Sequence, residues 1–147
     1  MKITEALLAE HQVFHNLFDH LERAAPKLRT LAEIKTVAAM LEAAMTAHSK
    51  TEDELFIGPL DHCFEQLGQC QTFHEEHDGI DRELQALKAA RDVRKARQLL
   101  LTVVATSRSH FDKEERIVFP LAERVLKSKT LLELGDQWMK RREATLK

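Results

Sequence analysis

Several residue types are scarce or absent in this chain, and each absence excludes a class of protein. The 147 residues contain no tyrosine, which excludes a tyrosyl radical. Only four glycines and three prolines interrupt a composition rich in Ala, Leu, Glu, Lys and Arg, which favours helix. The net charge of −2 shows no basic excess, so neither nucleic acid nor an anionic membrane is an expected partner.

Cysteines and long apolar runs are also lacking. The two cysteines, Cys63 and Cys70, form no CxxC pair and no disulfide framework, so we expect reduced thiols in a cytoplasmic protein. No apolar run approaches the roughly 20 residues of a membrane span. The charged N-terminal residues contain no hydrophobic region of a signal peptide. A chain of 147 residues is long enough for one domain with its own core.

Histidine, in contrast, is in excess, and two of the eight histidines belong to a repeated stretch. His48 is followed by Glu52, and His110 by Glu114, each time in the pattern HxxxE. An acidic residue, an apolar run and a proline follow each copy. Helical residues four apart lie on one face, so each copy presents an imidazole and a carboxylate to one point. Two such faces turned toward each other make a metal site.

A second repeat precedes each of these stretches. Residues 10–14 (EHQVF) resemble residues 76–80 (EHDGI), and the shared pattern contains His11 and His77. The chain thus consists of two predicted helix hairpins, each with EHxx-apolar followed by HxxxE. Two hairpins related by an approximate two-fold axis would form a near-symmetric site of four His and two Glu. Such a site suits two metal ions bridged by carboxylates.

Hydrophobic periodicity predicts helices and no strand. The expected helices cover residues 4–25, 31–57, 71–90 and 92–118, with shorter helices at 60–67 and 131–147. We expect an all-α protein: an up-down-up-down four-helix bundle over residues 1–128 and a C-terminal helical extension over residues 129–147. In that topology the helix rise of about 1.5 Å per residue places His11, His48, His77 and His110 roughly 9–14 Å from the same end of the bundle.

Local signals predict where these helices begin and end. Thr4 and Asp92 are expected N-caps. Gly58-Pro59 is expected to stop the second helix, and Pro120 to kink or break the fourth. Gly135, with Asp136, is expected to interrupt the last helix.

The order His, HxxxE, His, HxxxE, with an apolar residue and a proline after each HxxxE, resembles the hemerythrin-like HHE cation-binding family. The resemblance covers about residues 4–125. It implies a four-helix bundle that contains a non-haem di-iron centre. The implied ligands are His11, His48, Glu52, His77, His110 and Glu114, with Glu52 and Glu114 as the bridging carboxylates.

The chain departs from the oxygen-carrying hemerythrins, which have HxxxH on the third helix and HxxxxD on the fourth. Here Phe73 stands four residues before His77, and the fourth helix offers Glu114 four residues and Glu115 five residues after His110. His74 and His15 are candidate extra ligands. These differences favour the broader HHE group, whose roles include oxygen or iron sensing, nitric oxide and peroxide chemistry, and iron-centre repair.

Other metal sites fit the sequence less well. Neither the HExxH motif of zincins nor the ExxH motif of ferritin-like proteins occurs. Six His and Glu ligands without a thiolate suit two borderline metals such as iron, with manganese or zinc as possible substitutes. With six protein ligands for two metals, coordination stays open for O2, NO or peroxide.

Three functions remain open at this point. The first is a di-iron protein that binds or senses O2 or a related diatomic, and the second is a di-iron enzyme that acts on peroxide or nitric oxide. The third is a bundle for iron storage, iron-centre repair or partner binding. The sequence does not decide between enzyme and binding protein, nor whether the helix around Trp138 forms a homodimer. Asp53, Glu54 and Glu115 are expected either to form a solvated face or to orient the histidines.

Overall fold

The computed structural model describes residues 1–66 and 70–144, and its regular elements are all helical. The α-helices are α1 (Ile3–Ala24), α2 (Leu31–Glu52), α3 (Gly58–Gln66), α4 (Cys70–Ala89), α5 (Val93–Lys113), α6 (Phe119–Val125) and α7 (Ser128–Ala144). A 3-10 turn, η1 (Ala25–Lys27), follows α1, and two π-helical segments, η2 (Asp53–Ile57) and η3 (Glu114–Val118), follow α2 and α5. Within the described residues there is no strand, which confirms the all-α prediction.

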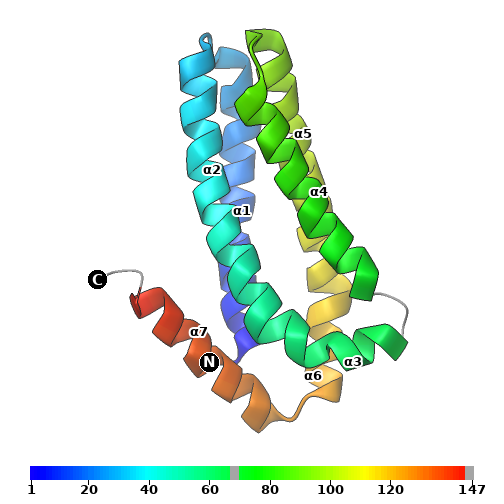
Figure 1. The fold of residues 1–147 in the computed structure, drawn as a ribbon. Coiled ribbons are helices and arrows are strands. Elements are labelled where there is room, and N and C mark those ends of the chain that lie inside the picture. The colour runs from blue at the N-terminus through cyan, green and yellow to red at the C-terminus, as the bar shows by residue number, and fades with distance from the viewer. Residues whose placement is uncertain (67–69, 145–147) are drawn as a thin grey trace.

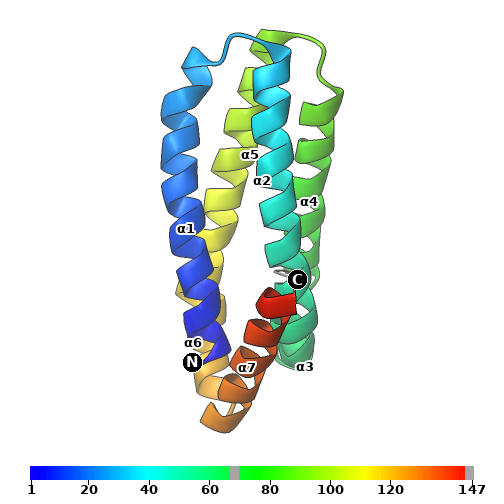
Figure 2. The same ribbon diagram turned by 90° about the vertical axis from the view of Figure 1, so that its left-hand side faces the viewer.

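Four long helices, α1, α2, α4 and α5, lie side by side (Figure 1). Helix α4 packs against α2 and α5, and α5 also packs against α1 and α2. The links from α1 to α2 and from α4 to α5 lie at one end, and α3, α6 and α7 gather at the other (Figure 2). No helix in the described part of the chain has the length and apolarity to cross a membrane. The side chains of Cys63, Cys70 and Phe73 lie outside the described residues.

The two predicted N-caps have different outcomes. Asp92 caps α5 as expected, since its carboxylate accepts from the backbone N–H of Lys95 at 2.8 Å. The prediction for Thr4 is wrong, because Lys2 is the N-cap of α1 and its N–H donates to the Glu5 carboxylate at 2.8 Å. Thr4 lies inside α1 and is buried. A cap is decided by which side chain reaches the free N–H groups, and here a carboxylate within the first turn does so.

The predicted stop at Gly58-Pro59 is wrong, since the chain passes from α2 through η2 into α3. A proline has no N–H and clashes with the carbonyl four residues earlier, so it cannot continue an ordinary α-helical turn. The π segment accommodates this, because the N–H of Gly58 bonds the carbonyl of Asp53, five residues back. The helical path therefore continues where propensity predicts an end.

The second copy of the repeat has the same local structure. In η3 the N–H of Phe119 bonds the carbonyl of Glu114, and Pro120 lies in the first turn of α6. The predicted break at Pro120 is therefore also wrong, since the chain stays helical from α5 through η3 into α6. Segment η2 begins directly after Glu52, and η3 begins at Glu114. Single π turns are frequent at functional sites, which directs attention to these two carboxylates.

The buried apolar residues form two clusters, one on either side of a polar layer. The cluster inside the long helices includes Phe14, Phe18, Leu84, Leu100 and Phe111. The cluster at the end formed by η2, α6 and α7 includes Ile3, Leu7, Phe56, Phe119 and Leu131. Along α1, buried His11 stands between Leu7 of the second cluster and Phe14 of the first. The polar layer is thus enclosed by apolar side chains from both ends.

Helix α7 packs against α1 and is not interrupted at Gly135, contrary to the prediction. Instead, the glycine allows the backbone at the start of the chain to approach α7 closely. A Cβ at Gly135 would lie 2.0 Å from the backbone oxygen of Met1. Glycine permits this contact because it has no Cβ. The helix tolerates the glycine because neighbouring residues such as Leu131 and Leu134 are buried.

We therefore expect Gly135→Ala to lower the free energy of unfolding by about 1–3 kcal/mol, as overpacking does. Chemical denaturation of the metal-stripped protein measures this change. Gly79→Ala is the matched control, since the nearest atom to its Cβ would be a guanidinium nitrogen of Arg82 at 3.9 Å. In an open helical position that change should add about 1 kcal/mol. Equal stabilisation by both substitutions would contradict the close contact.

Candidate metal centre

The structure brings six of the eight predicted ligands together in the polar layer. They are His11 of α1, His48 and Glu52 of α2, His77 of α4, His110 of α5 and Glu114 of η3, and all are buried. Their ligand atoms form two groups whose members all lie within 4.8 Å of one another. One group contains His11 and His48, the other contains His77 and His110, and Glu52 and Glu114 belong to both. The two carboxylates are thus placed where they can bridge two cations.

In each of the four histidines, the ring nitrogen that faces away from the cluster lies within hydrogen-bond distance of a carboxylate. Nδ1 lies 3.0 Å from Glu115 in His11, 2.8 Å from Glu10 in His48, 3.0 Å from Asp53 in His77 and 2.8 Å from Glu76 in His110. Ionised carboxylates only accept hydrogen bonds, so we assign the proton to Nδ1 in all four rings. The remaining nitrogen, Nε2, then carries a lone pair directed into the cluster.

The outer carboxylates follow the sequence repeat. Glu10 and Glu76 each precede one histidine of the cluster and bind the histidine of the next long helix. Asp53 and Glu115 each follow a cluster glutamate and bind His77 and His11. For Asp53 and Glu115 the structure favours the orienting role over the solvated face. The sequence analysis missed Glu10 and Glu76, although the two Glu-His pairs in the repeat were the available signal.

The inner nitrogens face one another in pairs. Nε2 of His11 lies 3.2 Å from Nε2 of His48, and Nε2 of His77 lies 2.8 Å from Nε2 of His110. With both Nδ1 atoms protonated, two facing lone pairs repel each other. Each pair therefore needs a proton or a metal ion close by.

The oxygens of Glu52 and Glu114 test whether metal ions fit here. All four are buried and make no hydrogen bond of acceptable geometry. The nearest nitrogens are Nε2 of His110, 2.8 Å from Glu114, and Nε2 of His77, 3.7 Å from Glu52. Buried carboxylate oxygens without partners cost free energy, which bound cations would offset. Nitrogen and oxygen donors without thiolate suit borderline divalent metals such as Fe(II), so the residues fit a pair of such ions.

The comparisons with known proteins agree with this chemistry. A model of the hemerythrin HHE cation-binding domain matches residues 2–122. The chain belongs to this family. The match confirms the resemblance inferred from the motifs and ends before α7. No curated protein and no solved structure matches the chain. The HHE domain and its buried His and Glu cluster together indicate cation binding.

The two carboxylates of this HHE domain differ in their protonation. Burial and the neighbouring charge of Glu114 raise the pKa of Glu52 well above its usual 4.5. Burial acts in the same direction on Glu114, but contacts with His110 and His77 outweigh it and hold its pKa below the usual range. Burial also disfavours the charged form of His77, but Asp53, Glu114 and Glu52 outweigh it and raise its pKa to about 10. The raised pKa values of Glu52 and His77 thus favour protons at positions that a metal would take.

Metal binding is therefore expected to release protons and to strengthen as pH rises. A ligand atom must lose its proton before it binds a cation, and the raised pKa values of Glu52 and His77 favour the protonated forms in the metal-free protein. The apparent affinity for Fe(II) should rise about tenfold per pH unit for each proton released. Anaerobic calorimetry in two buffers of different ionisation enthalpy counts these protons. A pH-independent affinity with no proton release would contradict the assignment.

Aromatic side chains enclose the His11–His48 half of the centre. The ring of Phe111 stacks on His11 with centroids 3.9 Å apart and planes 8° apart. Phe14 meets His48 edge-on at 5.3 Å, and Phe119 lies 5.2 Å from His11. These rings limit the rotation of both imidazoles.

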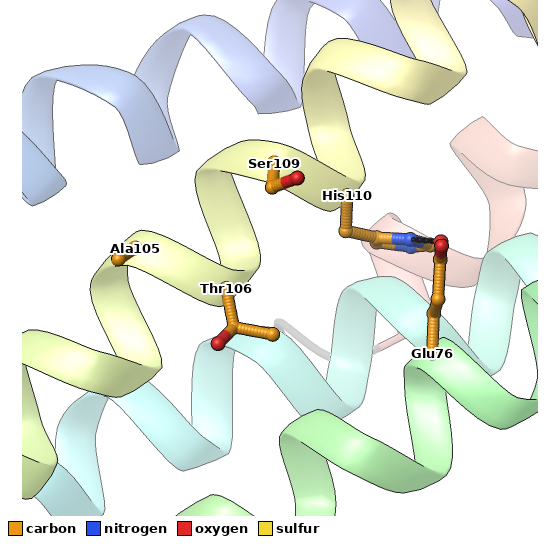
Figure 3. A pocket seen from close by; sticks show the side chains of 5 residues that line it. All are labelled: Glu76, Ala105, Thr106, Ser109 and His110. Atoms are coloured by element: carbon orange, nitrogen blue, oxygen red, sulfur yellow. Dashed lines mark hydrogen bonds and ion pairs between the residues drawn. The ribbon is translucent and has the colours of Figure 1, made fainter.

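Hollows on the surface reach the outer side of the centre. A cavity of about 380 Å³ is lined by Glu76 and His110 together with Ala105, Thr106 and Ser109 (Figure 3). A cavity of about 350 Å³ is lined in part by Glu10 and His48, and one of about 260 Å³ by Asp53 and His77. Each hollow opens on a histidine and its outer carboxylate, not on the shared glutamates.

The remaining two predicted ligands lie outside the buried six. Nε2 of His15 lies 2.9 Å from Glu115, and these two form a separate, more exposed group of potential ligands with Asp112. The side chain of His74 is 52% exposed and its Nε2 lies 3.9 Å from Asp61. His15 shares a face of α1 with His11, but its ring does not reach the cluster. Glu115 lies between His15 and the cluster and accepts from both His11 and His15.

Proposed function

We propose that this HHE protein is a non-haem di-iron protein that binds or senses O2 or a related small diatomic such as NO. One observation carries the proposal: four buried Nε2 atoms converge on two buried carboxylates whose oxygens have no hydrogen-bond partners. The His11–His48 pair would hold one iron and the His77–His110 pair the other, with Glu52 and Glu114 within reach of both. Manganese or zinc could substitute for iron at the same atoms.

Bound iron would supply the electrons and the open coordination positions that a diatomic ligand needs. The chain's own residues do the rest. Outer carboxylates such as Glu10 and Glu76 hold the imidazoles in one tautomer and make Nε2 a better donor. Phe111 and Phe14 pack against the rings of His11 and His48 and restrict their movement.

We propose further that α1, α2, α4 and α5 form an up-down-up-down bundle within residues 1–128, with residues 129–147 as an extension. The support for this arrangement is that α1, α2, α4 and α5 each contribute at least one of the six buried residues, at one depth of the molecule. Cations held by all four helices would join them, so metal removal should weaken the fold.

The experiment is an anaerobic Fe(II) titration with metal analysis, followed by spectra on addition of O2. We expect about two irons per chain and a reversible oxygen adduct. The double variant His48→Ala/His110→Ala should bind neither iron. The variant His20→Ala, at an exposed histidine, is the control and should bind both. Failure of the native chain to bind iron, or iron binding by the double variant, would overturn the proposal.

A di-iron enzyme that acts on peroxide or nitric oxide is the second candidate. The observation in its favour is the equality of the two ligand groups, each with two histidines and the two shared glutamates. Both irons would then keep open positions, as turnover of these substrates requires. Rapid irreversible oxidation by O2, together with turnover of peroxide or NO, would favour this candidate over reversible binding.

A further inference from the structure

A chain of contacts leads from the C-terminal helix α7 to a buried histidine. Nε of Arg142 donates to Oε1 of Glu10 at 2.6 Å, and Nδ1 of His48 donates to Oε2 of the same carboxylate at 2.8 Å. Nη1 of Arg142 also donates to Oγ1 of Thr51 at 3.2 Å. One guanidinium thus joins α7 to α1 and α2 beside the His48 ligand position.

The corresponding carboxylate in the other half is held differently. Glu76 accepts from Nδ1 of His110 at 2.8 Å, and its other oxygen accepts from Lys113 of the same helix as His110. Helix α7 lies against α1 and η2, away from α4 (Figures 1 and 2). The two halves are therefore near-symmetric in their ligands but not in what holds the outer carboxylates.

Arg142 is well placed to hold this geometry. Its side chain is 24% exposed, and its guanidinium lies 5.6 Å from the ring centroid of Trp138, also on α7. A guanidinium is a planar fork that donates in fixed directions, so it can bind Glu10 and Thr51 at once. The neighbouring Arg141 also joins α7 to the rest of the chain, but through Glu54. Among the described residues no hydrogen bond or ion pair joins Glu54 to a histidine of the cluster.

We propose that Arg142 is a positioning residue that makes the His11–His48 half of the centre depend on the docking of α7 through Glu10, whereas Glu76, the corresponding carboxylate of the other half, is held by Lys113 of α5. The inference rests on the proposed di-iron site. With α7 docked, Glu10 stays directed at Nδ1 of His48. With α7 released, Glu10 can turn to solvent, and His48 loses the acceptor that keeps its Nε2 directed inward. Coupling of this kind is reciprocal, so a cation in this half also stabilises docked α7.

The test compares Arg142→Ala, Arg142→Lys and Arg141→Ala in anaerobic Fe(II) titrations of the full chain. Loss of an outer hydrogen-bond partner typically weakens metal binding about 10–100-fold, so Arg142→Ala should show that loss at one of its two sites. Arg142→Lys should give an intermediate loss, because an ammonium cannot reproduce the fork. Arg141→Ala is the matched control and should bind both irons with native affinity. Native affinity in Arg142→Ala, equal weakening of both its sites, or an equal loss in Arg141→Ala would overturn the inference.

A second measurement does not depend on iron. Nitrogen NMR of the metal-free protein reports the tautomer of each histidine. We expect the Nδ1–H form of His48 to be lost in Arg142→Ala and kept in Arg141→Ala, with His110 unchanged in both. An unchanged His48 in Arg142→Ala would overturn the positioning role. If the native chain binds no iron, the proposed function fails, and this comparison alone decides whether Arg142 positions His48.

Discussion

Glu52→Gln is expected to abolish binding of the metal pair while leaving the metal-free protein about as stable as the native one. Glu52 lies in both ligand groups, so neither ion keeps its full donor set without it. Burial and the charge of Glu114 raise the pKa of Glu52, which favours the uncharged form that glutamine resembles. The loss of affinity should exceed the roughly 10–100-fold that removal of an outer partner costs.

Two measurements separate these effects. Anaerobic Fe(II) titration should fall from two irons to one or none, whereas denaturation of the metal-stripped protein should change by less than about 1 kcal/mol. Glu54→Gln is the matched control, on the π segment that follows Glu52. Glu54 pairs with Arg141 at the surface, so this substitution should affect neither quantity appreciably. Retention of two tightly bound irons by Glu52→Gln would refute the bridging position.

Phe111→Ala is expected to lower both stability and metal affinity. Phe111 is 1% exposed, and its ring contacts Phe14 and Phe18 as well as His11. Removal of a buried phenylalanine side chain costs about 3–5 kcal/mol, because apolar contacts are lost and a cavity remains. That cavity lies against the stacked face of His11, so the imidazole gains freedom to turn away from the cluster.

The control for this prediction is Phe18→Ala. Phe18 is equally buried and contacts Phe111, but it makes no ring contact with His11 or His48 among the described interactions. It should lose similar stability in urea unfolding of the metal-stripped protein and keep native Fe(II) affinity in the folded state. Equal loss of affinity in both variants would show that general loosening, and not the stacking on His11, is responsible.

Part of the site was predictable because it depends only on the spacing of residues within one helix. A histidine and a carboxylate four residues apart share a helix face wherever they occur, so the pairs His48–Glu52 and His110–Glu114 follow from the helix period alone. The helices themselves follow from composition and apolar period, and Asp92 caps α5 as its local sequence predicts. The family also follows from the motif order, and the match over residues 2–122 confirms it.

Other predictions failed where a distant part of the chain outweighs a local preference. Gly135 predicts an interruption by propensity, but the backbone of Met1 occupies the space that a side chain there would need. Pro59 predicts the end of a helix, because it has no N–H to donate. The preceding π turn accommodates the proline, and the buried neighbours Phe56 and Leu60 hold the helix in place. Packing free energy exceeds the helix propensity of about 1 kcal/mol that disfavours Gly135, and the π turn avoids the larger cost of a proline in an ordinary α-helical turn.

The sequence by itself thus determined the helical class, the family and the residue types of the centre, because each depends on spacings within one helix. Only the tertiary structure decided which carboxylate holds which histidine. Glu10 stands beside His11 in the sequence but binds His48 of the next helix, and Arg142 reaches Glu10 from the far end of the chain. These partners depend on how the helices pack side by side, which the spacing of residues within one helix does not predict.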